Sequence, residues 1–83
     1  AAAQLLGDTY VQLEEYGKAV NAFEKAAASG NELIAPMSLK KLGFVQMELG
    51  NNKAAMDAFE TIKSEYPVSV EAQDIDKYIA IVK

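Results

Sequence analysis

The chain has 83 residues, about half of them apolar, and a formal charge of −4 at neutral pH. This size suits one small domain, and the apolar content excludes a disordered acidic tail. All eight basic residues are lysines, and Cys and His are absent. The composition therefore disfavours nucleic-acid binding and excludes disulfides and thiolate sites.

The spacing of apolar residues predicts helices throughout and no strands, because apolar positions recur at intervals of three and four. The first two helices are expected over residues 1–13 and 18–29. The inward face of the first is predicted to hold Ala3, Leu6, Tyr10 and Leu13. The inward face of the second is predicted to hold Ala19, Phe23 and Ala26. Gly30 ends the second helix, since glycine readily adopts the left-handed conformation that follows a helix.

The third helix is expected to begin between Glu32 and Pro36, because proline is tolerated only in a first turn, and to end at Leu49. The fourth is predicted over residues 53–65. A fifth, over 69–83, begins near Ser69, a good N-cap. The third helix is expected to turn Leu39, Leu42 and Leu49 inward. The stripe of the fifth is Ala72, Ile75, Ile79 and Val82.

An internal repeat relates the two halves of the chain. The pair Leu6-Gly7 returns 36 positions later (42 minus 6) as Leu42-Gly43. A period of this length is typical of arrays in which each unit stacks on its neighbours to bury its apolar face. The other recurring residues are Leu13, Ala19, Ala22, Phe23 and Glu24, which return as Leu49, Ala55, Ala58, Phe59 and Glu60.

These residues resemble the signature of the tetratricopeptide repeat. The first unit matches at Leu6-Gly7, Tyr10, Ala19 and Phe23, and the second at Leu42-Gly43, Ala55, Phe59 and Pro67. The resemblance implies an all-α fold of two antiparallel helix-turn-helix repeats with a C-terminal capping helix, wound as an α-solenoid superhelix. The expected boundaries are about 1–31 and 36–67 for the repeats and 69–83 for the capping helix. The fifth helix could instead open a further repeat.

Physical reasons support the pattern of small and large residues. Gly7 and Gly43 allow the two helices of a unit to approach closely, and Phe23 and Phe59 then fill the space between helices. The period exceeds the typical length by about two residues, which places an insertion near residues 32–35. We expect this insertion to lengthen one connection or tilt one unit against the other.

No arrangement for chemistry is evident in the sequence. Nucleophilic catalysis needs a nucleophile beside a base, and the serines lie at or near helix ends without His or Cys in the chain. There is no calcium loop, no glycine-rich phosphate loop and no cofactor motif. The acidic pairs are interpreted as solvated surface. The chain is therefore predicted not to be an enzyme and to bind no metal or cofactor.

The first helices of successive units line a concave groove in the fold that the resemblance implies. The candidate groove residues are Asp8, Val11, Gln12, Lys40, Phe44 and Met47. An exposed apolar patch can mark an interaction site, and Met adapts to irregular partners. The alternative for Phe44 and Met47 is packing against a neighbouring helix or against a further repeat upstream.

Two functions follow as hypotheses. The first is a non-enzymatic protein-interaction scaffold that holds a protein or peptide in the groove, without nucleic acid or direct membrane contact. The second is a terminal segment of a longer array that mediates self-association. Residues 64–79 are similar to the carboxyl end of membrane-anchored bacterial cell-envelope proteins with these repeats, and we interpret the chain as a fragment. The periplasmic face of the cell envelope and the cytoplasm remain alternative locations.

Overall fold

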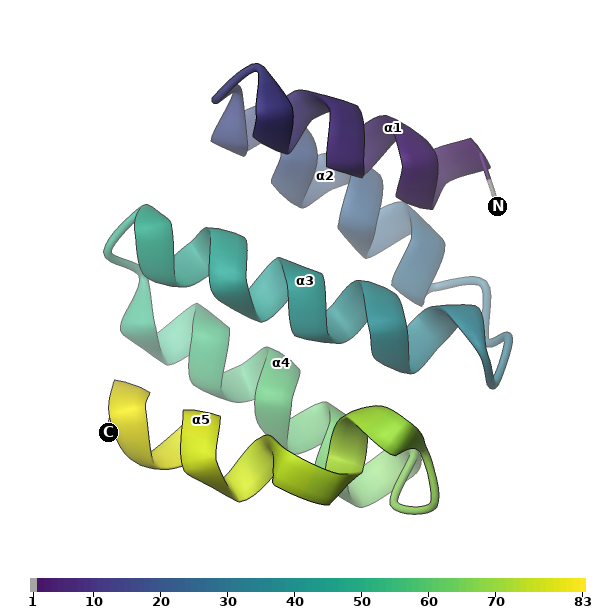
Figure 1. Ribbon diagram of the computed structural model, residues 1–83, viewed down its shortest axis with the longest axis vertical. Helices are drawn as coiled ribbons and strands as arrows, with labels where there is room; N and C mark the ends of the chain where they lie inside the picture. The colour runs from purple at the N-terminus through teal and green to yellow at the C-terminus, as the bar shows by residue number, and fades with distance from the viewer. Residues whose placement is uncertain (1) are drawn as a thin grey trace.

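In the computed structural model, which describes residues 2–83, helices alternate between two layers. The elements are α1 (Ala2–Gln12), α2 (Tyr16–Ala27), α3 (Ile34–Glu48), α4 (Asn52–Glu65), the 3₁₀ turn η1 (Val70–Asp74) and α5 (Ile75–Val82). Helices α1, α3 and α5 lie side by side in the front layer, with α2 and α4 behind them (Figure 1). The Cα extents of 29 × 27 × 15 Å fit two helix layers. No strand occurs among the described residues, so the all-α prediction is confirmed.

The two helix pairs repeat each other at the level of the backbone. The residue before α2, Glu15, has φ −93° and ψ 70°, and the residue before α4, Asn51, has φ −92° and ψ 70°. Their amides donate to the carbonyl oxygens of Tyr10 and Gln46, each at 2.8 Å. The sequence repeat is therefore also a repeat of turn geometry, which identifies two helix-turn-helix units.

The close approach of paired helices depends on glycine. A Cβ atom built on Gly7 would lie 2.5 Å from the ring of Phe23, and one on Gly43 would collide with the ring of Phe59 in the same way. Both rings are fully buried. Each glycine therefore makes room for the phenylalanine of its own unit, as the sequence predicts.

The last segment covers the outer side of α4. Ile75, Ile79 and Val82 are buried against the same core as Ile62 of α4. The hydroxyl oxygen of Ser69 accepts a hydrogen bond from the amide of Ala72 at 3.2 Å, which confirms the predicted N-cap. The segment starts as the 3₁₀ turn η1, however, and becomes α-helical only at Ile75.

Three leucines that the periodicity turns inward are exposed. Leu13 and Leu49 follow the last residues of α1 and α3, so each lies in a turn, where the helical stripe no longer sets its direction. Leu6 lies within α1 beside α2, but it borders an open pocket that no further helix of the described residues covers. The inward prediction was wrong for all three. Helix α2 also begins at Tyr16, two residues before its predicted start, and Ala1 lies outside the described residues.

Candidate functional site

A pocket separates α1 from α3 in the front layer. Its volume is about 160 Å³, and its lining consists of Asp8, Val11, Phe23, Lys41, Phe44 and Val45. Phe23 comes from α2 and is fully buried, so it forms the floor between the two front helices. We call this surface the front groove. It has an apolar floor and two charged residues in its lining.

The charged residues of the front groove form an ion pair across it. The Nζ atom of Lys41 lies 2.9 Å from Oδ1 and 3.0 Å from Oδ2 of Asp8. Both side chains are more than a third exposed, so water screens the pair and its net contribution to folding is at most about 1 kcal/mol. Its structural effect is to join α1 to α3 on a side where the two helices are otherwise separated by the pocket.

Phe44 belongs both to the front groove and to an aromatic cluster. Its ring centroid lies 5.8 Å from that of Phe59 and 5.0 Å from that of Tyr78, with edge-to-face geometry in both pairs. Such pairs stabilise by about 0.5–1.5 kcal/mol beyond their buried area. Phe44 nevertheless remains 37% exposed to solvent. Packing against α4 and α5 therefore holds Phe44 in place and leaves its open side toward the groove.

The structure brings together three of the six predicted groove residues. Asp8, Val11 and Phe44 line the pocket, whereas Gln12, Lys40 and Met47 do not. Gln12 is exposed at the last position of α1, and Met47 is half-buried against the core.

Lys40 points toward η1 and α5 and does not line the front groove. Its Nζ atom donates to Oδ1 of Asp74 at 2.9 Å and lies 5.0 Å from the ring centroid of Tyr78. One residue along a helix rotates the side chain by about 100°, so the neighbouring Lys41 points at α1 instead. Lys40 and Lys41 lie four and three residues before Phe44, so helical spacing alone does not distinguish them.

The contact with Lys40 lowers the pKa of Asp74. The main cause is the hydrogen bond from the Lys40 ammonium group, which favours the charged carboxylate. Because the pKa of Asp74 is lower in the folded state than in the unfolded state, its charged form stabilises the fold at pH values above the unfolded-state pKa. This contribution is lost as pH falls through the folded value.

Replacing Lys40 by methionine should raise the pKa of Asp74 toward its ordinary value. Methionine keeps an unbranched apolar stem but donates no hydrogen bond, so the carboxylate loses its main stabilising contact. An NMR titration of the Asp74 carboxyl carbon measures the change, with Lys53→Met as the control at an exposed lysine. If Asp74 titrates identically in the Lys40→Met variant and in the protein without this substitution, the contact with Lys40 does not control the pKa of the carboxyl group.

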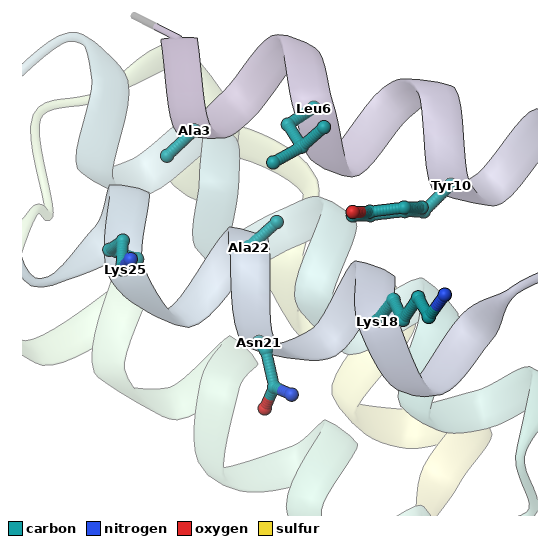
Figure 2. Close-up of a pocket in the computed structure, with 7 residues that line it drawn as sticks. All are labelled: Ala3, Leu6, Tyr10, Lys18, Asn21, Ala22 and Lys25. Atoms are coloured by element: carbon teal, nitrogen blue, oxygen red, sulfur yellow. The ribbon is translucent and has the colours of Figure 1, made fainter.

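A second pocket lies on the free side of the first helix pair. Its volume is about 370 Å³. Figure 2 shows Leu6 and Tyr10 between the ribbons of α1 and α2, with Lys18 below Tyr10. The Lys18 ammonium group lies 5.8 Å from the Tyr10 ring centroid. The lining residues are Ala3, Leu6, Tyr10, Lys18, Asn21, Ala22 and Lys25. We call this surface the α1 end face.

Comparison of the two units shows what the α1 end face corresponds to. The equivalents of Leu6 and Ala22 in the second unit are Leu42 and Ala58, 36 positions later. Leu42 is 8% exposed, because α3 packs on α2, whereas Leu6 is 48% exposed. The same type of surface is therefore covered in the second unit and open in the first.

Chemical sites are not apparent in the part of the chain that the structure describes. Over residues 2–83, no group of three His, Cys, Asp or Glu side chains is arranged to hold a metal ion. The helices of this part are also too short or too polar for any of them to cross a membrane.

The family model of the tetratricopeptide repeat matches residues 1–29, which contain α1 and α2. Together with the second helix pair of the same turn geometry, this match supports tetratricopeptide-like repeats in the chain. Repeats of this family generally mediate protein–protein interaction, and the family is typically non-enzymatic. No curated protein and no solved structure matches the chain in the other two comparisons.

Proposed function

We propose that the chain is a non-enzymatic protein-interaction module that holds a segment of a partner protein in the front groove. The observation that supports this most is Phe44, a large aromatic residue that is fixed by Phe59 and Tyr78 and yet remains 37% exposed beside the pocket. A rigid, partly exposed aromatic ring can gain contact area at little cost in conformational entropy.

The chemistry of the front groove suits a segment with one apolar side chain near its centre. Val11, Phe23 and Phe44 provide apolar contacts, and the pocket of about 160 Å³ is large enough for one such side chain. At the rim, Lys41 can donate hydrogen bonds and Asp8 can accept them, because both side chains are more than a third exposed. With two units, the groove is short, so we expect weak affinity for an isolated peptide.

Selection of peptides from a displayed random library on the immobilised chain supplies the probe for a test. We expect Val11→Ser and Phe44→Ala each to weaken the selected peptide about tenfold, since each removes an apolar contact of roughly 1–2 kcal/mol. Ile81→Ser is the matched control, because Ile81 is exposed on α5 and lies outside the pocket lining. Unchanged affinity in Val11→Ser, whose side chain lies outside the aromatic cluster, would exclude the front groove.

A second candidate function rests on the α1 end face. We propose that this face pairs with another helix, in a second copy or in a longer array, and that residues 1–31, 36–67 and 69–83 form two repeats and a capping helix of one superhelix. The support is the contrast between exposed Leu6 and buried Leu42. Sedimentation over a range of concentrations tests self-association directly, and a Leu6→Lys variant should abolish it.

A further inference from the structure

A third surface joins two connections that are far apart in the sequence. The connection from α2 to α3 and the one from α4 to η1 lie at the same edge of the molecule (Figure 1). Between them is a pocket of about 530 Å³. Its lining consists of Glu32, Leu33, Met37, Glu65, Tyr66, Pro67, Val68, Ser69, Val70 and Glu71. We call this surface the loop patch.

The apolar residues of the loop patch are unusually open to solvent. Leu33 is 79% exposed, Val68 97% and Val70 73%, the highest values among the large apolar residues of the described chain. Connections usually carry polar residues at such positions, so three open aliphatic side chains around one pocket are characteristic of an interaction surface. Removing them from water on contact with a partner is favourable.

The charged residues of the loop patch are all acidic. Glu32 and Glu65 are exposed, Glu71 is half-buried, and the lining contains no lysine. The four ion pairs within residues 2–83 include none of these glutamates. The patch therefore presents aliphatic side chains surrounded by negative charge that no side chain of the described part neutralises.

The longer connection between the units contributes part of this surface. Six residues separate α2 from α3, whereas three separate α1 from α2 and three separate α3 from α4. The side-chain oxygen of Asn31 accepts from the amides of Leu33 and Ile34 at 2.9 and 3.0 Å, so this connection has a defined conformation. The added length that the repeat period indicates thus places Glu32 and Leu33 at the edge of the array.

We propose that the loop patch binds a basic segment of a partner protein whose lysines or arginines flank aliphatic side chains. Its apolar residues would occupy the pocket beside Val68 and Leu33, and its cations would pair with the three glutamates. Charge complementarity favours this occupant. A second copy would bring the same glutamates face to face, and an anionic membrane or nucleic acid would be repelled by them.

Synthetic peptides provide the test with the whole chain. The probe is a helical peptide of lysine and leucine, and its two controls replace lysine by glutamate or leucine by serine. We expect only the probe to bind and to shift the amide resonances of Leu33, Val68 and Val70. Higher salt should weaken it, because the charges are exposed.

Variants of the chain separate local complementarity from overall charge. The triple variant Glu32→Gln, Glu65→Gln and Glu71→Gln should weaken the probe about tenfold, since each exposed ion pair contributes modestly. The matched control has the same net charge, with the changes Glu14→Gln, Glu24→Gln and Glu48→Gln. Val68→Ser should also weaken binding, and its high exposure makes it neutral for folding.

Three outcomes would overturn the proposal. The first is equal weakening by the two triple variants, which would mean that only net charge acts. The second is a set of amide shifts confined to the front groove or the α1 end face. The third is protection of the loop patch in a dimer of the chain, or its binding to vesicles of anionic phospholipid, which would assign the patch to another occupant.

Discussion

Replacing Phe59 by alanine should lower the free energy of unfolding by about 3–5 kcal/mol, the typical loss for a buried aromatic side chain. Phe59 of α4 is fully buried and contacts α3 and α5. Its ring fills the space above Gly43 in α3 and packs against Phe44, and its centroid lies 5.9 Å from that of Tyr78 in α5. Truncation leaves a cavity in the second unit and also removes support from the open aromatic residue of the front groove.

Urea denaturation followed by circular dichroism measures this loss. Phe59→Leu serves as a graded control, because it keeps much of the volume and should cost considerably less than alanine. If Phe59→Ala proves too unstable to fold, the leucine variant still gives the direction. A loss below about 1 kcal/mol for alanine would contradict the packing described for the second unit.

Equivalent leucines in the two units should respond differently to the same substitution. Leu42→Ala should cost about 2–5 kcal/mol, as is typical of a buried leucine, because Leu42 is 8% exposed. Leu6→Ala should cost less than about 1 kcal/mol, since Leu6 is 48% exposed and its truncation opens little cavity. The two positions occupy the same place in the repeat, so the difference isolates the effect of the covering helix.

Denaturation at a protein concentration low enough to keep the chain monomeric gives both values. Gln12→Ala, at an exposed polar position of α1, controls for changes in helix propensity. Equal losses for Leu6→Ala and Leu42→Ala would mean that the α1 end face is covered in solution, against the geometry of the first unit.

The repeat pattern was sufficient to predict the contact between glycine and phenylalanine within each unit. Gly7 and Phe23, like Gly43 and Phe59, have roles that follow from size alone: one residue leaves a space and the other fills it. These roles depend on contacts within a unit, which recur with the sequence. Leu6 and Leu42 differ in exposure because α2 packs on α3, whereas no helix of the described residues covers Leu6 in the same way. A comparison of the two sequence repeats does not reveal this difference.

The front groove was only partly predictable. Asp8 and Phe44 were assigned to it from their place on the first helices, and both line the pocket. The choice between Lys40 and Lys41 required the relative rotation of α1 and α3, because adjacent residues on a helix point about 100° apart. Periodicity fixes which side of a helix is buried against its own partner, but it leaves such rotations between units undetermined.

The loop patch was not predicted, since connections carry no periodic pattern that indicates which residues meet. The extra length near Glu32 was recognised from the repeat period. The proximity of Leu33 to Val68, which are 35 positions apart (68 minus 33), arises only because both connections lie at the same edge of the molecule. Exposed aliphatic residues in both connections were the available signal. Their meaning becomes clear only when the structure places them around one pocket.

The proposal that the front groove holds a partner segment is tested most directly by an amide NMR map of the isotope-labelled chain. The library-selected peptide is added in steps, and the shift of every backbone amide is followed. We expect the largest shifts at Val11, Lys41 and Phe44, on the two helices that border the groove. Shifts confined to the α1 end face or the loop patch, with these three residues unchanged, would contradict the proposal.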